Sequence, residues 1–288
     1  MTHDTFQAGD LTAVIGENSA QGDHRAGYNG VWSLTHKAEP TNLFVPTVAG
    51  LNFEHIFDGD KRDTDNSRKV FFEPRTAPMT FEKKPDGSVV LWQPTTPTFH
   101  LDSRTTFRLS APHYLDMEFR CTPTQHSFAH GYIGLFWANY INAPADKSIY
   151  FLHDKQWQQL CTPAHNNQST ARHREDEIEL KFSPGLGDAL YRNISPLRFD
   201  APFYYGMFRD MVFIIMFDRT KGIRFTHSPS GGGTNVEQHT TNPAWDWQYL
   251  LPRYEVRQDY GFRARLVYRP KCSRAEIVGE YEKWKQTG

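Results

Sequence analysis

The chain has 288 residues, enough for one large β domain or two small ones, and 38% of them are hydrophobic and 14% aromatic. With a net charge of -1, a pI near 6.9 and a mean hydropathy of -0.64, it has no global field that attracts nucleic acid or an anionic membrane. No apolar run reaches the roughly 18 residues of a membrane-spanning helix, so neither partner is expected.

The first 25 residues are polar and aperiodic, and they predict a loose arm ahead of one domain over residues 26–288. This arm lacks the basic and apolar regions of a signal peptide. The cysteines (Cys121, Cys161 and Cys272) are three in number and widely spaced, which fits free thiols in a reducing compartment. We therefore expect a cytoplasmic protein.

The densest group of polar side chains lies in the stretch from Gly50 to Asp65. Asn52 and Glu54 share one face of a strand, whereas the neighbouring His55 reaches the same pocket only if a β-bulge intervenes. Glu54 is the candidate general base or hydroxyl acceptor, with Asn52 orienting the ligand and His55 or His227 as a second catalytic group. The alternative is a glutamate that is solvated or paired with an arginine.

A carboxylate-rich loop follows directly, from Asp58 to Asp65. Its oxygens are of the kind that bind Ca²⁺, but Lys61 and Arg62 interrupt the spacing and no acidic residue closes the loop. A solvated hairpin is the preferred interpretation. The histidines are dispersed without a His-x-His pair, so we expect no metal and no cofactor, and a metal-dependent cupin-like enzyme is kept as an alternative.

From Tyr28 to about Tyr268, short apolar runs broken by Pro, Gly, Asn and Asp predict an all-β fold, a large antiparallel β-sandwich. Residues 113–121 alternate strictly, with Leu, Met, Phe and Cys on one face, and residues 211–217 are apolar on both faces, as in a central strand. Further strands are expected at 88–93, 131–140, 222–228 and 260–269. Ser273 and Glu276 have capping-box spacing and predict a C-terminal helix over about 273–286.

Other candidate residues come from distant parts of the chain. Arg75 follows a strand-like run, where its planar guanidinium can clamp a carboxylate or sugar hydroxyls, or pair with a glutamate. Glu118 or the nearby Asp116 is the expected second carboxylate if the reaction is a hydrolysis. Arg224 and His227 precede the glycine-rich residues 228–233, which are interpreted as a surface loop or a mobile lid.

Aromatic and amide side chains suit sugars, which present apolar C–H faces beside hydroxyl groups. Core packing is the alternative explanation for at least half of these rings. The predicted substrate-binding residues are Asn52, Trp92, Trp137, Asn139, Tyr140, Arg224, Trp245 and Trp247.

The order of three segments resembles the galactose mutarotase-like supersandwich proteins, which handle carbohydrates. These segments are Gly50-Leu51-Asn52-Phe53-Glu54-His55, the strand His-Tyr-Leu-Asp-Met-Glu-Phe-Arg-Cys at 113–121, and Gly-Leu-Phe-Trp-Ala-Asn-Tyr-Ile-Asn-Ala-Pro at 134–144. The Asn-His-Ser-Tyr-Phe-Asn-Leu type motif of true aldose epimerases is missing. The resemblance therefore implies a sugar-binding sheet face, without transferring a catalytic His and Glu.

Together these patterns predict a β-sandwich that binds a saccharide and processes it by acid/base chemistry, as an epimerase, lyase or glycosidase. A non-catalytic carbohydrate-binding module is the alternative from another class. The hypothesis requires that Glu54 share one concavity with Arg75, His227 and Trp245. Nothing in the sequence indicates the sugar or an oligomeric state.

Overall fold

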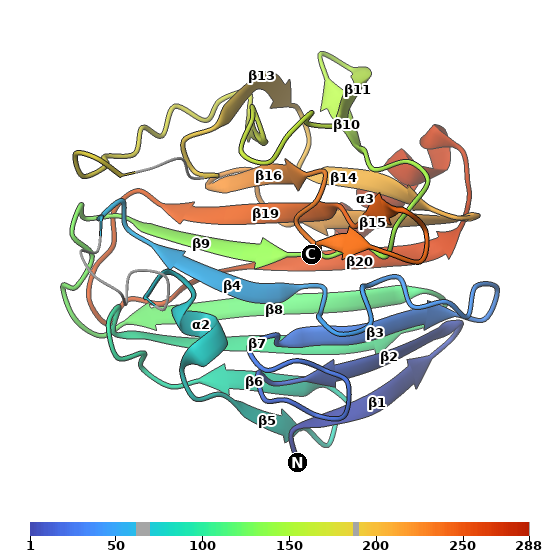
Figure 1. Ribbon diagram of the computed structural model, residues 1–288, viewed down its shortest axis with the longest axis horizontal. Coiled ribbons are helices and arrows are strands. Elements are labelled where there is room, and N and C mark those ends of the chain that lie inside the picture. Colours follow the sequence, from blue (N-terminus) through green and yellow to red (C-terminus); the bar gives the residue numbers. More distant parts are fainter. Residues whose placement is uncertain (62–69, 187–189, 288) are drawn as a thin grey trace.

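A computed structural model describes residues 1–61, 70–186 and 190–287 (Figure 1). Along the chain the elements are β1 (His3–Ala8), β2 (Leu11–Gly16), β3 (Gly30–His36), β4 (Asn52–Phe57), α2 (Glu73–Thr76), β5 (Thr80–Lys83), β6 (Val89–Gln93), β7 (Leu101–Ser110), β8 (Tyr114–Pro123), β9 (Ile133–Ala138), β10 (Ile149–His153), β11 (Gln156–Leu160), β12 (Thr170–His173), β13 (Ile194–Phe199), β14 (Phe203–Phe208), β15 (Met211–Phe217), β16 (Ile223–Ser228), β17 (Thr234–Asn235), β18 (Thr240–Thr241), β19 (Ala244–Leu251), β20 (Tyr260–Pro270) and α3 (Arg274–Thr287).

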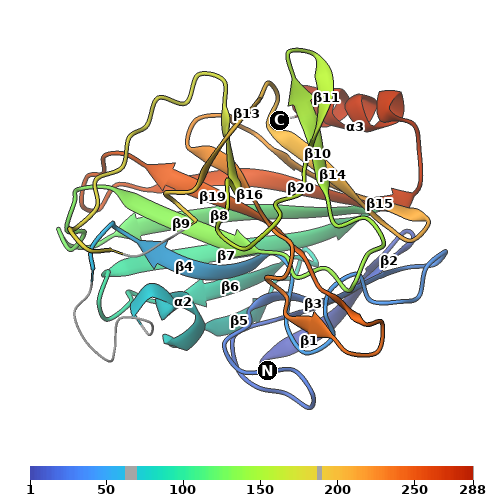
Figure 2. The same cartoon turned by 45° about the horizontal axis from the view of Figure 1, so that its top comes forward.

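Two large sheets pack face to face, which confirms the predicted all-β sandwich. In the described part of the chain, one sheet has nine strands in the order β11-β10-β14-β15-β20-β8-β7-β6-β5, and the other has six in the order β13-β12-β16-β19-β9-β4. Apart from the parallel β12–β13 pair, neighbouring strands in both sheets are antiparallel. Strands of the two sheets run in similar directions in both views, as in aligned sheet packing (Figures 1 and 2).

The main core lies between the sheets and follows the predicted alternation. In β8 the apolar side chains are buried in this core, while Asp116, Glu118 and Arg120 face outward. β15 is buried on both faces, because Phe213 and Ile215 enter the main core and Ile214 packs under α3 with Ile277. The central position expected for residues 211–217 is confirmed.

The predicted C-terminal helix is present as α3 and carries the predicted capping box. The backbone N–H of Ser273 donates to Glu276 Oε2 at 2.9 Å, and the backbone N–H of Glu276 donates to Ser273 Oγ at 3.2 Å. Ile277 and Tyr281 are buried against the nine-stranded sheet. Among the described residues, no helix combines the length and the hydrophobicity that a membrane span requires.

The N-terminal residues correct the predicted loose arm. Residues 3–16 form β1 and β2; β1 pairs with β2, and β2 pairs with β3, in an antiparallel sheet. Leu11, Ala13 and Ile15 are buried in the main core. Their alternation in burial with Thr12 and Val14 is a strand pattern, but the run is too short to stand out beside the polar residues around it.

Candidate functional site

A cavity of about 370 Å³ lies on the face of the six-stranded sheet that points away from the main core. A cavity of this size accommodates a small organic ligand. It is lined by Tyr28, Glu54, His55, Phe71, Phe72, Arg75, Phe136, Tyr140, His165, Asn166, Leu190, Ser228, Gly231, Ala244 and Asp246.

A β-bulge brings Glu54 and His55 to this cavity together. The register of β4 against β9 shifts between Phe53 and His55, so Phe53 opposes Trp137 and His55 opposes Phe136. Phe53 therefore enters the main core, while the next two side chains both leave it. A β-bulge was the condition for Glu54 and His55 to share one pocket, and the structure contains it.

Glu54 is a buried carboxylate held by several donors. Its Oε1 accepts one hydrogen bond from the Tyr140 hydroxyl and another from Arg75 Nη1 at 3.3 Å. His55 Nε2 lies 3.3 Å from the other oxygen, Oε2. Burial opposes ionisation of Glu54, but His55, Arg75 and Tyr140 together lower its pKa below the usual value. Glu54 is therefore ionised at neutral pH, with Oε2 as the less occupied oxygen.

His55 is enclosed by aromatic rings. Its imidazole stacks on Phe136 at 4.6 Å between ring centroids and contacts Phe71 at 4.0 Å and Phe72 at 4.6 Å. Burial lowers the pKa of His55 despite the neighbouring Glu54 carboxylate. The neutral imidazole contacts the Glu54 carboxylate, and the rings around it limit its contact with a ligand.

Arg75 links the carboxylate to the aromatic wall of the cavity. It extends from the short helix α2, donates from Nε to the Gly27 carbonyl at 3.0 Å, and lies over the Tyr28 ring at 4.1 Å. This contact holds the guanidinium in one orientation beside Glu54. The ion pair between Arg75 and Glu54 is one of the two roles that the sequence left open.

Asp246 is a second carboxyl group in the cavity, and the sequence analysis did not select it. It lies on β19 between Trp245 and Trp247, whose rings face the main core, so alternation directs Asp246 to the opposite face. The backbone N–H of Asn139 donates to its Oδ1 at 2.8 Å. Burial raises the pKa of Asp246 well above the usual value, and the Glu54 charge adds to this shift. The alternation of residues along β19 was the sequence signal that could have selected Asp246.

The segment before β12 contributes two further polar residues that sequence reasoning missed. The imidazole Nδ1 of His165 lies 2.7 Å from the Ser228 hydroxyl, across the rim of the cavity. Asn166 adopts a φ of 59°, and its buried Oδ1 has no hydrogen-bond partner among the described residues. Gly231, within the glycine-rich residues 228–233, completes this rim. The polarity of this segment was the main feature of the sequence that could have selected His165 and Asn166.

The structure places His227 in the interior, and it does not line the cavity. Its Nδ1 accepts from the backbone N–H of Thr162 at 3.2 Å, and its Nε2 lies 2.8 Å from the Lys147 carbonyl. These contacts assign the neutral tautomer with the proton on Nε2. Burial lowers the pKa of His227 to about 4. His227 connects β16 to two loops instead of approaching Glu54 from the cavity.

Most of the predicted sugar-binding rings belong to the main core. Trp137 and Trp247 stack at 5.7 Å between ring centroids, and Trp245 donates from Nε1 to the Lys147 carbonyl at 2.7 Å. The rings that line the cavity are instead Tyr28, Phe71, Phe72, Phe136 and Tyr140. Of the predicted sugar-binding aromatic residues, Tyr140 therefore lies at the cavity.

The predicted amide residues are also structural in their contacts. Asn52 Oδ1 accepts from the backbone N–H of Asn29 at 3.1 Å. Asn139 Oδ1 accepts from the backbone N–H of Leu51 at 2.8 Å, and its Nδ2 donates to the Trp245 carbonyl. Both amides connect loops to the sheet beneath the cavity.

Three other candidates lie outside the cavity lining. Arg224 is buried in an ion pair with Asp176, in which Nε and Oδ2 are 2.6 Å apart. Glu118 is on the outer face of β8 in the opposite sheet and pairs with Arg120 at 2.7 Å. Trp92 is exposed on β6, where its Nε1 donates to Asp102. The structure does not bring these side chains to Glu54.

Possible metal ligands lie away from the cavity. His153, Asp154 and Asp200 place ligand atoms within 4.8 Å of one another, but Arg174 pairs with both aspartates. In the loop after β4, Asp58 accepts backbone N–H groups of Asp60 and Ala129. Asp63 and Asp65 lie outside the described residues.

Comparisons with known proteins place the fold. No protein-family model matches the chain, and no curated protein matches it. A candidate aldose 1-epimerase from Escherichia coli K12 superposes with a TM-score of 0.54 at 10% identity, covering 94% of this chain and 99% of that one. The Slr1438 protein from Synechocystis sp. PCC 6803 reaches 0.52 at 10% identity, covering 94% of this chain and 98% of that one.

A galactose mutarotase-like protein from Lactobacillus casei gives a TM-score of 0.50 at 12% identity, covering 92% of this chain and 99% of that one. At such identities the likeness concerns the fold. The resemblance inferred from residues 50–55, 113–121 and 134–144 is thus confirmed at that level: the chain has a galactose mutarotase-like sandwich fold.

Proposed function

We propose that this protein binds a saccharide in the cavity around Glu54 and processes it by acid/base catalysis. The observation that carries the proposal is a pair of carboxyl groups, Glu54 and Asp246, that line one cavity and have opposite pKa shifts. A pair of this kind supplies an ionised base and a protonated acid at the same pH. Its fold is similar to that of a candidate aldose 1-epimerase, which agrees with this chemistry.

In the proposed mechanism Glu54 removes a proton from the substrate through Oε2. Its Oε1 is occupied by Tyr140 and Arg75, which hold the carboxylate in place. Asp246, whose carboxyl group is kept neutral by burial, donates a proton to an oxygen of the sugar. The Tyr28 and Phe72 rings offer apolar surface to the C–H face of the sugar.

Anomerisation is one reaction that these two groups complete without a co-reactant. Glu54 would take the proton of the anomeric hydroxyl while Asp246 protonates the ring oxygen, so that the ring C–O bond breaks and a carbonyl forms. The reverse transfers on the other face of that carbonyl close the ring and restore both protonation states. Epimerase, lyase and glycosidase chemistry all need the same donor and acceptor.

The test is turnover by the isosteric variants Glu54→Gln and Asp246→Asn. Interconversion of glucose, galactose and mannose anomers is followed by exchange NMR, and cleavage of oligosaccharides by product analysis. We expect each variant to lose at least about 100-fold in kcat/KM while its circular dichroism is unchanged. Glu118→Gln is the matched control, because it changes an exposed carboxylate on the opposite sheet and leaves turnover intact.

Wild-type activity in Glu54→Gln would end the catalytic assignment. Saccharide binding by wild type with no product from any substrate would instead identify a carbohydrate-binding module. No binding of any saccharide would overturn the proposed function altogether.

A further inference from the structure

A strap formed by residues 174–186 and 190–193 covers part of the sheet face beside the cavity. Its apolar side chains, Ile178, Leu180, Phe182, Leu186 and Leu190, pack against the aromatic cluster on that face. Tyr191 stacks on Phe57 with 4.3 Å between ring centroids. Leu190 is also part of the cavity lining, so the strap provides one wall of the cavity.

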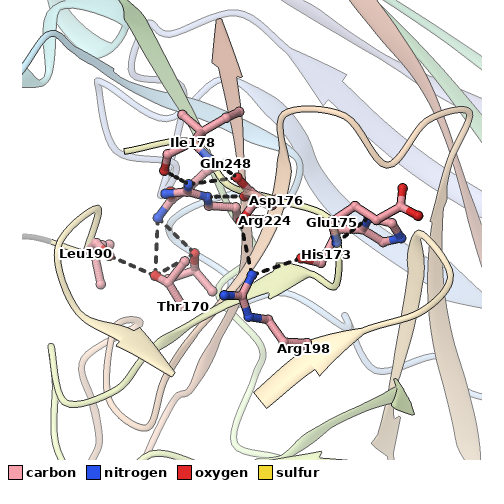
Figure 3. A network of polar contacts seen from close by, with 10 residues as sticks. Thr170, His173, Glu175, Asp176, Ile178, Leu190, Arg198, Arg224 and Gln248 are labelled. Carbon is pink, nitrogen blue, oxygen red and sulfur yellow. Dashed lines mark hydrogen bonds and ion pairs between the residues drawn. The ribbon is translucent and has the colours of Figure 1, made fainter. Parts of the chain in front are cut away.

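One end of the strap is attached to the sheet by Arg224 of β16. Its guanidinium donates to both carboxylate oxygens of Asp176, at 2.6 and 3.1 Å, and to the Ile178 carbonyl at 2.7 Å (Figure 3). Arg198 donates to the Asp176 carbonyl at 3.0 Å. Such a buried bidentate ion pair has one well-defined geometry. It therefore holds the strap at a defined place above the sheet.

The other attachment reaches Leu190 itself. The hydroxyl of Thr170 donates to the Leu190 carbonyl at 2.8 Å, and Gln248 Nε2 donates to the Thr170 and Thr226 hydroxyls (Figure 3). Gln248 lies two residues after Asp246 on β19, on the same face of the sheet. Thr170 and Gln248 thus link the wall residue Leu190 to β19, the strand that carries the proposed acid.

We infer that this wall limits the length of the saccharide that the site accepts. Beyond Leu190 the sheet face is occupied by the strap, so a chain of sugars cannot continue across the sheet in that direction. A single sugar fits a cavity of 370 Å³ closed on this side. Leu190 is then a specificity-determining residue, and Thr170 is the residue that positions it. This inference rests on the proposed function.

The test compares affinities for short and long saccharides, so that it separates length selection from stability. Glucose, maltose and maltohexaose, with cellobiose and cellohexaose, are titrated calorimetrically against wild type, Leu190→Ala and Thr170→Val. We expect wild type to bind the preferred short sugar at least about tenfold more tightly than its hexaose. Leu190→Ala should bring this ratio near unity by strengthening hexaose binding, and Thr170→Val should shift it in the same direction.

Thr105→Val is the matched control, because it makes the same change at a buried threonine of the opposite sheet. It should leave the affinity ratio unchanged. Substituting Arg224 is less informative, since it leaves Asp176 buried without its cation and threatens folding.

An unchanged ratio in folded Leu190→Ala overturns the inference and leaves the proposed function standing. Equal wild-type affinity for short sugars and hexaoses does the same. If wild type binds none of the probes, the proposed function fails, and the length limit fails with it.

Discussion

At the scale of single residues, the two carboxyl groups of the cavity differ because their neighbours differ. Glu54 has Arg75, Tyr140 and His55 around it, whereas Asp246 is buried, accepts a hydrogen bond from the Asn139 backbone N–H, and is exposed to the Glu54 charge. The same chemical group is therefore ionised in one position and neutral in the other.

The pH dependence of kcat/KM should follow from these shifts. Glu54 must be ionised, so activity should fall at acid pH only below its usual pKa of 4.5, because its pKa is lowered. Asp246 must be protonated, so activity should fall on the basic side, well above its usual pKa of 3.8. Rates of the wild-type protein measured across the pH range check both limbs. An acid limb centred above 4.5 would contradict the assignment of Glu54.

His227 should make the fold sensitive to acid. Its pKa falls from 6.5 to about 4 on burial, so between these values the unfolded chain binds a proton that the folded chain does not. Stability from this residue is present above pH 6.5 and is lost as the pH falls toward 4. The loss between pH 7 and pH 5 should be about 2 kcal/mol. Urea unfolding of wild type and His227→Gln measures it, and an equally steep pH dependence in the variant would refute the contribution.

At the scale of elements, β4 decides which side chains reach the cavity. Without its bulge, Glu54 and His55 would point to opposite faces, and one of them would enter the core beside Phe53. Leu190 of the strap and Phe71, Phe72 and Arg75 then add to the cavity lining. Glu54, His55 and Asp246 come from strands of the sheet, whereas Tyr28, Arg75 and Leu190 come from segments that connect strands.

The helix α3 offers an independent test of a local signal. Ser273→Ala removes the side chain that accepts from the Glu276 N–H, and should lower stability by about 1 kcal/mol. Ser273→Thr retains a hydroxyl and should lose much less. Denaturant midpoints and amide exchange within residues 274–287 report the change. Equal losses in both variants would show that the cap contributes nothing.

At the scale of the whole molecule, stability comes from the aromatic core between the sheets. Trp137 is 0% exposed and packs against Trp247, Phe53 and Phe119, so Trp137→Ala should cost about 3–5 kcal/mol. Trp92 is 37% exposed on the outer face, and Trp92→Ala should cost about 1 kcal/mol or less. Thermal and urea unfolding compare the two variants. Similar losses would mean that the rings between the sheets are not the dominant core.

The fold class, the long strands and the helix cap were predictable because their signals are local. Alternation in residues 113–121, the apolar run at 211–217 and the Ser273–Glu276 spacing each reflect burial or capping within a few residues. The short strands of residues 3–16 escaped because each has only six residues and polar residues surround them. Within the cavity, Glu54, His55, Arg75 and Tyr140 were also selected from the sequence.

Alternation and apolar runs in the sequence predicted which strand faces are buried, and local composition selected Glu54, His55 and Arg75. Tertiary structure alone decided which of those polar groups meet: it brought Asp246 and His165 to Glu54 and placed Glu118 on the other sheet. The reason is that alternation specifies a face of a strand but not the partner strand, the bulge or the neighbouring charges. These depend on contacts between residues far apart in the chain.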